Sequence, residues 1–567
     1  MKRQLFALFF AVVACGDRSE LGSPDAGGRP DAGDNNDGGA GPAEDRVVAC
    51  DNDPIPTSNA VCDFLTGTNG ATLIRADVVG PDALYQNGQV LINASGQVAC
   101  AGCDCQSEAA FADAARLNCA NGVVAPASIN AHDHITFTET PPTPPPSEDE
   151  RYDHRHDWRT GRNGGTEIRS VRNQSATHGV WWGELRQLMA GTTAINGSGA
   201  QDGLLRNLDR ANQEGLDEPA VFYSTFPLDD ISGRTRNADC SYDGFDSPDD
   251  NRFQQSQAYT PHIAEGIDQA ARNEFICQSG GRSDGVDIMT DKTAVIHGIG
   301  LTADDWALMG ARQSGLIWSA RTNIDLYGIT ADVITAAQSG VQIALGTDWT
   351  ATGSMNILRE LRCVDSYNRD YLDGFFSDRS LVDMATKNAA GVLRIDDRLG
   401  VLAPGREADI TIYNASTRDG YRSIIEADPQ DISLVMRSGV ALYGDDVLID
   451  ALVGTDAGCE SIDVCGSTKR VCSEQETGFP LSTHRAEIAA NAYELFYCDT
   501  PPMEPTCVPF RPGEFMGAST NLDADGDGAV DSVDNCPTVF NPIRPVDNGQ
   551  QSDTDLDGLG DACDPCP

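Results

Sequence analysis

Apolar, strand-like runs alternate with helical patterns between residues 126 and 395, and this alternation restricts the possible folds more than any other feature of the chain. The strand candidates are residues 192–196, 220–224, 294–297, 315–319 and 342–346, and the helix candidates include 304–314 and 331–339. An alternation over about 270 residues is typical of a (β/α)8 barrel. A doubly wound α/β sheet is the alternative, but no Gly-rich phosphate-binding loop supports it.

Short β-rich runs, separated by Gly and Asn, flank this region on both sides. They are residues 71–79, 88–93 and 97–102 before it, and 400–413 and 432–439 after it. Runs of this kind between turn residues predict a small antiparallel sheet. We therefore expect residues 70–125 and 396–450 to form one composite β-sandwich beside a barrel of residues 126–395.

Two histidines follow the apolar run 123–129. His132 and His134 are separated by one residue. At the end of a buried strand both rings would lie on one face, because strand side chains alternate with a period of two. The pair indicates a metal site, with two solvent-facing histidines as the alternative reading.

Three further strand-like runs end in side chains that bind metals. His262 is followed by Glu265, His297 ends the run 294–297, and Asp348 comes after a Gly turn. Each alone also fits a buried histidine bonded to a carbonyl oxygen, or an aspartate that caps a helix. In a barrel, functional groups lie at the C-terminal ends of the strands, so their shared placement favours a single site.

Together these motifs resemble the amidohydrolase superfamily, in its imidazolonepropionase and cytosine deaminase branch. The matching segments are residues 130–134, 262–265, 296–298, 322–323, 345–348 and 405–410, within a resemblance that covers about residues 70–450. It implies one metal ion bound by His132, His134, His262 and Asp348. It further implies that Glu265 carries protons, with His297 orienting the attacking water and Asn323 on the substrate side.

The implied ligand set suits the implied chemistry. Three imidazoles and a carboxylate suit one Zn²⁺ and tolerate Fe²⁺, with a coordination position left for water. The metal lowers the pKa of that water towards about 7, and a nearby carboxylate can protonate a leaving nitrogen. No lysine occurs between His134 and Lys292, which excludes for that region the carboxylated lysine that bridges two metals in binuclear relatives. We expect hydrolysis of a C–N bond, in a cyclic amide or an amino group on a heterocycle.

Two segments depart from the family pattern and one insert is added. Residues 126–128 read Pro-Ala-Ser in place of Pro-Gly, and residues 319–323 replace the usual Pro-x-Ser-Asn. The insert 138–162 follows the first metal motif directly, so we predict a substrate lid, with a solvated surface loop as the alternative. His154 and His156 repeat the His-x-His spacing there without a preceding apolar strand, and we do not predict a second metal site from them.

Two other functions stay open. The first is a catalytically inactive, calcium-binding surface or adhesion protein, and the second is the same site cleaving a C–Cl or ester bond. The presence of all four implied ligands and of Glu265 favours an active enzyme with a small-molecule substrate. A net charge of −46 argues against nucleic acid or an anionic membrane surface as partner, because phosphate binding requires clustered Lys and Arg.

The N-terminal residues read as an export signal. Residues 1–15 have a basic start and a short apolar stretch, and they end in a sequence that resembles a bacterial lipobox. That resemblance implies cleavage before Cys15 and attachment of a lipid to its thiol. This lipid would be the only expected contact with a membrane. An ordinary signal peptide is the alternative. Residues 16–69 are predicted to be a tether, rich in Gly, Asp and Pro at its start. The expected location is the bacterial cell envelope, in the periplasm or at the outer membrane or cell surface.

The C-terminal part contains many cysteines and then two acidic loops. In an exported chain the 18 cysteines indicate disulfides, and we expect a Cys-rich region at residues 451–520.

Residues 521–567 place aspartates at positions 1, 3, 5, 9 and 12 of two loops with Gly at position 6: Asp523, Asp525, Asp527, Asp531 and Asp534, then Asp553, Asp555, Asp557, Asp561 and Asp564. This is the spacing of an EF-hand loop, with Asp in place of the final Glu. The segment resembles thrombospondin type 3 repeats, which implies bound Ca²⁺; a disordered acidic tail is the alternative.

Overall fold

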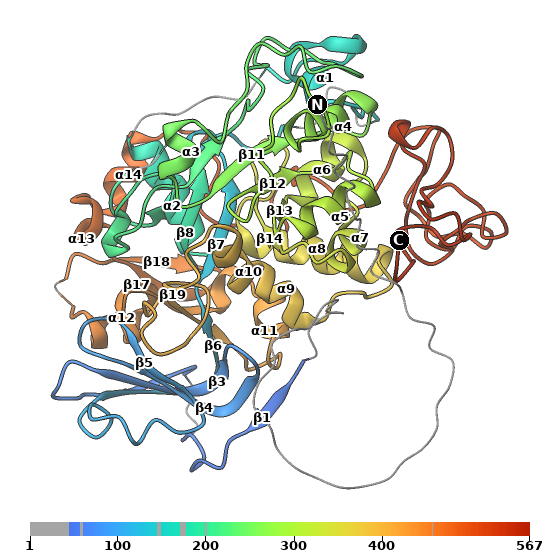
Figure 1. The fold of residues 1–567 in the computed structure, drawn as a ribbon. Coiled ribbons are helices and arrows are strands. Elements are labelled where there is room, and N and C mark those ends of the chain that lie inside the picture. Colours follow the sequence, from blue (N-terminus) through green and yellow to red (C-terminus); the bar gives the residue numbers. More distant parts are fainter. Residues whose placement is uncertain are drawn as a thin grey trace, which may run out of the picture.

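The computed structural model describes residues 45–56, 60–143, 149–169, 177–197, 199, 201–455 and 457–567. A central α/β domain lies between a large β-sheet and the C-terminal segment (Figure 1). The predicted signal sequence, Cys15 and the tether up to residue 44 lie outside the described residues. Among the helices of the described part, none has the length and apolar character needed to cross a membrane.

The central domain is a ring of parallel strands in chain order. One ladder contains β7 (Ser128–Asp133), β8 (Thr192–Gly197) and β9 (Arg206–Asn207), and the other contains β10 (Phe222–Ser224), β11 (Tyr259–Ile263), β12 (Ala294–His297), β13 (Gly315–Trp318) and β14 (Ile343–Leu345). The ladders meet where the Val221 amide donates to the Leu208 carbonyl at 2.7 Å. The ring closes where the Asp348 amide donates to the His132 carbonyl at 3.0 Å. This arrangement agrees with the predicted (β/α)8 barrel.

Helices follow the strands regularly only in the second half of the ring. They include α4 (Gln269–Gln278), α5 (Ala303–Ala311), α6 (Ala320–Tyr327), α7 (Val333–Gln338) and α8 (Ile357–Tyr371), with α2 (Thr177–Leu188) between β7 and β8. Between β8 and β10 the only helical element among the described residues is the short 3-10 turn Gln213–Gly215, so the alternation is less strict than predicted. Short polar side chains start several helices: Asp268, Asp332 and Asn356 accept backbone N–H groups at the first turns of α4, α7 and α8.

The flanking segments form one sheet. Its main strands are β3 (Thr72–Val79), β4 (Leu84–Ile92), β5 (Val98–Gly102), β6 (Ala115–Pro126), β15 (Ile410–Asn414), β16 (Ile432–Arg437) and β17 (Val440–Asp445). β6 and β15 pair antiparallel from Pro126–Ile410 to Gly122–Asn414, which joins the two ends of the chain as predicted. Hydrogen bonds connect all eleven strands, and side chains from both flanks share one hydrophobic core, as the predicted composite domain requires.

This sheet extends beyond both predicted boundaries. β1 (Val47–Ala49) pairs with β4, β2 (Asp63–Leu65) pairs with β6, and disulfides tie Cys50 to Cys103 and Cys62 to Cys119. The predicted tether was therefore too long, because these cross-links hold a polar segment on the sheet. At the other end β18 (Glu460–Val464) and β19 (Ser467–Val471) continue the sheet past residue 450. Their mostly polar side chains gave no apolar alternation to predict them from.

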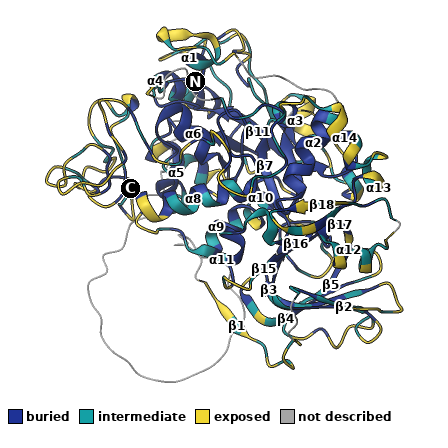
Figure 2. Cartoon of the chain, turned by 180° about the vertical axis from the view of Figure 1, so that it is seen from behind, coloured by how far each residue is buried: buried dark blue, intermediate teal, exposed yellow. Residues whose placement is uncertain are grey.

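The remaining C-terminal segment, residues 501–567, packs on the barrel with little regular secondary structure. It contains the 3-10 turn η5 (Pro545–Asp547) and is attached to α8 by the Cys363–Cys507 disulfide. Phe515 and Phe540 belong to the main hydrophobic core, although much of the segment's surface is exposed (Figure 2). None of the described cysteines is free.

Candidate metal centre

The predicted ligands come together at one end of the barrel. His132 lies on β7 and His134 just after it, His262 lies on β11, and Asp348 follows β14. His297 is the last residue of β12. Because the strands are parallel and end at the same rim, these side chains converge at the C-terminal mouth of the ring.

The distances define a compact cluster. The Nε2 atoms of His132 and His134 each lie 3.2 Å from Oδ1 of Asp348. The rings of His132 and His262 have centroids 4.8 Å apart. One ligand atom each from His132, His262 and His297 lies within 4.8 Å of the others, as does one each from His132, His134 and Asp348. All four predicted metal ligands therefore surround one small volume.

The chemistry of this donor set fits a divalent cation. Nδ1 of His132 and Nε2 of His262 are buried without a hydrogen-bond partner, and Nε2 of His132 has Asp348 as its near neighbour at 3.2 Å. Burying such nitrogens is costly unless a ligand occupies the space. Nδ1–H of His262 donates to the Ser224 carbonyl at 3.0 Å, which fixes the ring and leaves Nε2 free to bind a metal.

The protonation states also suit metal binding. Burial lowers the pKa of His132 to about 4 and holds that of His262 well below its ordinary value, so both rings are neutral at pH 7. Burial opposes ionisation of Asp348, but hydrogen bonds and charges from His132 and His134 outweigh it and hold the pKa of Asp348 well below its usual range. Burial opposes protonation of His134, but its hydrogen bond and charge interaction with Asp348 outweigh this and raise its pKa. A metal ion bound by all four side chains would displace that proton, because neutral imidazoles beside an ionised carboxylate are the forms that bind Zn²⁺.

Asp133, between the two first ligands in sequence, lies on the opposite side of the strand from them. Its Oδ2 accepts hydrogen bonds from Asn130 Nδ2 at 3.0 Å, Thr347 Oγ1 at 2.9 Å and Gln187 Nε2 at 3.0 Å. This network joins β7 to the residues after β14 behind the ligands. The period of two in a strand places Asp133 there, but only the folded barrel brings in Thr347 and Gln187.

Glu265 and His297 lie beside the ligand cluster. Oε2 of Glu265 is 3.7 Å from Nε2 of His297, and Oε1 accepts a hydrogen bond from the Tyr327 hydroxyl at 2.8 Å. Nδ1–H of His297 donates to Oδ1 of Asn323 at 2.9 Å. Asn323 is fully buried behind His297 and does not line the cavity, so the expectation that it faces the substrate was wrong. Its side chain instead orients the His297 ring.

Three non-glycine residues of the site have left-handed backbone conformations. The φ angles are +54° at Ala264, +74° at His297 and +55° at Asp348. Such conformations cost of order 1 kcal/mol or more and persist only where the surroundings enforce them. Here they turn the chain sharply after β11, at the end of β12 and after β14, where the predicted functional residues lie.

A cavity of about 260 Å³ opens above the cluster. Its walls include the aromatic side chains Phe137, Trp158, Phe226 and Trp349, together with Arg155, Arg159 and the residues His134, His262, Glu265, His297 and Asp348. Arg155, Trp158 and Arg159 come from α1 (Arg155–Thr160), inside the insert predicted to be a lid. The described part of the insert thus forms one wall of the cavity. Sequence patterns did not reveal Phe226, Trp349 or Tyr327, which lack a motif of their own.

An ion-pair network anchors α1 beneath this wall. Arg155 Nη2 lies 2.6 Å from Asp230, and His156 Nε2 lies 2.8 Å from the same carboxylate oxygen. His154 Nε2 is 3.4 Å from Glu274. All five side chains are buried, so they fix the helix relative to the barrel.

The two acidic loops of the C-terminal segment share most of their internal hydrogen bonds. The amides of Gly528 and Gly558 donate to the first aspartates, Asp523 and Asp553. Three further backbone amides donate to aspartates at equivalent positions of both loops. In the first loop these bonds are Ala524 N to Asp531, Ala529 N to Asp527 and Cys536 N to Asp534. In the second loop they are Thr554 N to Asp561, Leu559 N to Asp557 and Cys566 N to Asp564. In each loop the first three aspartates place carboxylate oxygens within 4.8 Å of one another.

Comparison with known proteins finds similarity over parts of the chain. Residues 257–442 match the amidohydrolase family, and this range includes His262, Glu265, His297 and Asp348 but not His132 or His134. A 5-methylthioadenosine/S-adenosylhomocysteine deaminase from Teredinibacter turnerae is 30% identical over 135 residues, which are 23% of this chain and 30% of that protein. Guanine deaminase from Homo sapiens is 25% identical over 195 residues, 33% of this chain and 43% of the relative. The chain therefore spans less than half the length of either relative.

A solved structure of an adenosine deaminase from Xanthomonas campestris with bound zinc aligns with 65% of this chain and 92% of its own, at 15% identity and a TM-score of 0.47. The match to the amidohydrolase family extends over residues 257–442, and the other part of the metal centre stands on its own geometry.

Proposed function

We propose that this protein is an exported, metal-dependent hydrolase that cleaves a C–N bond, with one Zn²⁺ or Fe²⁺ held by His132, His134, His262 and Asp348. The observation that carries the proposal is the convergence of these four side chains, together with the buried, unpartnered Nε2 of His262. The family match of residues 257–442 supports the same chemistry.

The roles of the other residues follow from their positions. When bound, the metal would supply a water acidic enough to react as hydroxide at neutral pH. His297, fixed by Asn323, orients that water through Nε2. Glu265 accepts the water proton and returns it to the leaving nitrogen, since its carboxylate borders both the cavity and His297. Proton transfer of this kind typically contributes about 10² to 10⁴ in rate.

The cavity favours a planar, amino-substituted heterocycle as substrate. Phe137, Trp158, Phe226 and Trp349 offer aromatic faces and edges, which pack well against a flat ring. The relatives named above are deaminases of purine compounds, and the same reaction here would release ammonia. A cyclic amide uses the same groups, but its ring opening would release no ammonia.

Metal analysis followed by a substrate panel tests the proposal. The purified protein should contain about one Zn²⁺ or Fe²⁺ per chain, lose activity with a transition-metal chelator and recover it when the metal is restored. Aminopurines, aminopyrimidines and cyclic amides should be compared with chlorinated rings and esters, using wild type and Glu265→Gln. A metal-free barrel would refute the proposal. If the enzyme hydrolyses only esters or only chlorinated rings, the bond that it cleaves is an ester bond or a C–Cl bond and not a C–N bond.

We further propose that Ca²⁺ occupies the loops 523–534 and 553–564. The matching hydrogen bonds of the two loops support this, as does Oδ2 of Asp525, which is buried without a partner in a side chain only 4% exposed. Affinities of roughly 10⁻⁴ to 10⁻³ M are typical of extracellular calcium modules. Calcium should slow chymotrypsin cleavage at the Phe and Leu residues within 505–567, whereas equal rates with calcium and with EGTA would contradict the proposal.

We propose, finally, that the chain is exported and anchored by a lipid on Cys15. Its many disulfides support an oxidising compartment such as the cell envelope. Cys15→Ser should release the protein from the membrane fraction with activity unchanged. Mass spectrometry of the N-terminal peptide tests the modification directly, and an unmodified peptide in a membrane-bound protein would exclude it.

A further inference from the structure

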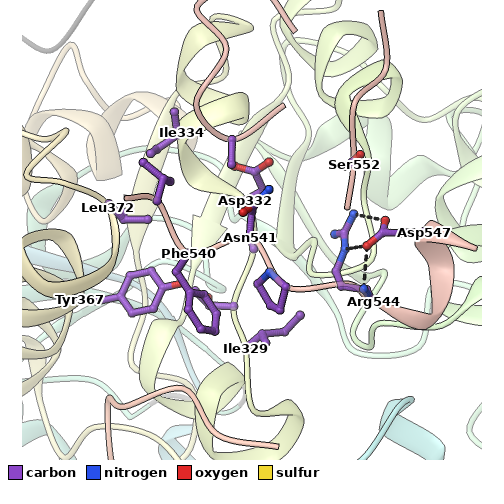
Figure 3. Close-up of a pocket in the computed structure, with 15 residues that line it drawn as sticks. Ile329, Asp332, Ile334, Tyr367, Leu372, Phe540, Asn541, Arg544, Asp547 and Ser552 are labelled. Carbon is purple, nitrogen blue, oxygen red and sulfur yellow. Dashed lines mark hydrogen bonds and ion pairs between the residues drawn. The ribbon is translucent and has the colours of Figure 1, made fainter. Parts of the chain in front are cut away.

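The C-terminal segment touches the barrel on the side where the active-site loops lie. Phe540 of the segment and Tyr367 of α8 line a small pocket of about 50 Å³ at this boundary (Figure 3). The Tyr371 hydroxyl donates to the Gly517 carbonyl at 2.7 Å, and Thr335 Oγ1 donates to the Asp561 carbonyl at 3.0 Å. The segment is therefore packed and hydrogen-bonded to the enzyme along its length.

One arginine of this segment reaches elements that hold the active site. Arg511 is 8% exposed and donates from Nη1 to the carbonyl oxygens of Tyr152 at 3.1 Å and Tyr327 at 2.9 Å. Its Nη2 lies 2.6 Å from Oδ1 of Asp153. The next contact is equally close, because the Phe510 amide donates to the Gly328 carbonyl at 3.0 Å. A Cβ added at Gly328 would lie 2.4 Å from the Phe510 carbonyl oxygen, so the two backbones need a glycine here.

Tyr327 connects Arg511 to Glu265. Its side chain is fully buried, and its hydroxyl donates to Glu265 Oε1 at 2.8 Å while accepting from Trp158 Nε1 at 2.9 Å. Tyr327 is the last residue of α6, so the bonds from Arg511 and Phe510 hold the end of the helix that carries it. Only one residue therefore separates the C-terminal segment from the carboxylate that borders the cavity.

The same arginine holds the base of the cavity wall. Tyr152 and Asp153 immediately precede α1, whose Trp158 lines the cavity. The Ile267 amide donates to the Asp153 carbonyl at 2.8 Å, and the Arg155 amide donates to the Glu265 carbonyl at 3.0 Å. Arg511 thus reaches Glu265 from two sides, through the Tyr327 hydroxyl and through the backbone of the insert.

A second arginine supports the neighbouring loops. Arg544, paired with Asp547 in Figure 3, donates from Nη1 to the carbonyl oxygens of Ile299 and Leu301, both at 2.9 Å. The Val546 amide donates to the Ile267 carbonyl at 3.1 Å. Ile299 is two residues after His297 and Ile267 is two residues after Glu265, so these bonds lie directly behind the site.

We propose that Arg511 is a positioning residue that acts through Tyr327 to hold the Glu265 carboxylate in place for proton transfer. This inference rests on the proposed function for its kinetic part. On this proposal the C-terminal segment contributes to catalysis, because Arg511 lies outside the barrel and positions the Glu265 carboxylate inside it. A misplaced proton-transfer group slows the chemical step more than it weakens substrate binding.

The kinetic test compares Arg511→Ala, Tyr327→Phe and the double variant with wild type, and uses Arg282→Ala as control. Arg282 pairs with Asp284 at an exposed position. We expect Arg511→Ala to lower kcat about tenfold with KM changed less than about twofold, and Arg511→Lys to restore part of kcat. The double variant should be no slower than the slower single variant, because both changes break one chain of contacts.

Amide hydrogen exchange provides a readout that does not depend on activity. Arg511→Ala should exchange faster than wild type in peptides covering residues 149–160 and 263–268, while Arg282→Ala should not. If Arg511→Ala does not fold, Arg511→Lys is judged on the same two measurements. Unchanged exchange together with unchanged kcat, or rate losses that multiply in the double variant, would overturn the proposal. If wild type turns over no substrate, the proposed function fails, and the exchange data alone decide whether Arg511 holds these loops.

Discussion

The backbone N–H of Asp348 donates a hydrogen bond to the carbonyl oxygen of His132, 3.0 Å away. The side chains of the same two residues face each other, with 3.2 Å between Nε2 of His132 and Oδ1 of Asp348. The contact that closes the barrel between its last and first strands therefore also assembles the metal ligands. Because the backbone bond does not depend on the side chain, metal binding can be separated from barrel closure.

Asp348→Asn should remove the metal without opening the barrel. An amide is a poor substitute for an ionised carboxylate between two imidazoles, so we expect metal affinity to fall at least about 100-fold and activity with it. Far-UV circular dichroism should be unchanged, and metal content after dialysis is measured by mass spectrometry. Asp291→Asn, at an exposed ion pair with Arg394, is the control. A variant that keeps a full equivalent of metal would show that Asp348 is not a ligand.

Phe137→Ala should weaken substrate binding more than catalysis. Phe137 forms part of the aromatic wall and packs 5.9 Å from the Trp349 ring, centroid to centroid. Losing one aromatic contact with a planar ring costs about 1 kcal/mol, so KM should rise roughly fivefold to tenfold. The measurement is steady-state kinetics on the best substrate of the panel. Phe111→Ala, which lies in a separate core of the flanking sheet, should leave KM unchanged.

Glu184 should make stability fall as the pH rises. Burial raises its pKa from 4.5 to about 8, despite hydrogen bonds from Asn207 and from the Leu205 amide. The folded protein therefore keeps a proton that the unfolded chain has lost between these pH values. Unfolding free energy should decrease by about 1.4 kcal/mol per pH unit in that window from this group alone.

Glu184→Gln should remove this contribution, so its melting temperature should exceed that of wild type near pH 8 and differ little near pH 5. Calorimetry at both pH values, with exposed Glu487→Gln as control, measures the difference. Parallel curves for wild type and Glu184→Gln would contradict the raised pKa.

The Cys363–Cys507 disulfide should contribute more stability than the Cys100–Cys105 disulfide. The first links residues 144 apart and the second residues 5 apart. Closing these loops in the unfolded chain costs about 5 and about 2 kcal/mol in the chain-entropy model. The Cys363→Ser/Cys507→Ser variant should therefore melt at a lower temperature than the Cys100→Ser/Cys105→Ser variant, and chymotrypsin should cleave its C-terminal segment faster than that of wild type. Equal destabilisation would mean that the long loop is already constrained without the disulfide.

The ligand set could be predicted because each member follows a local rule. His132 and His134 obey the period of a strand, and His262, His297 and Asp348 each end an apolar run, so one rule about barrel rims brings them together. β9 escaped prediction because two residues, Arg206 and Asn207, carry no periodicity. Element type was therefore predictable where a run was long enough to show its pattern.

Contacts between distant segments could not be predicted from one sequence. Tyr327 is an ordinary residue at a helix end until the fold places its hydroxyl 2.8 Å from Glu265. Arg511 lies 184 residues further along the chain, and only packing shows that it bonds the Tyr327 carbonyl. Asn323 was misassigned for the same reason, since its motif position does not reveal that it faces His297.

The pairing of β6 with β15 has a consequence for how the protein is made. On one edge β6 pairs with β3, but on the other edge residues 122–126 can pair only when residues 410–414 have been made, so the strand that leads into the barrel keeps that edge open during most of synthesis. Unpaired strand edges attract other chains and proteases. A truncated product that stops before residue 410 would leave that edge exposed to other chains and to proteases.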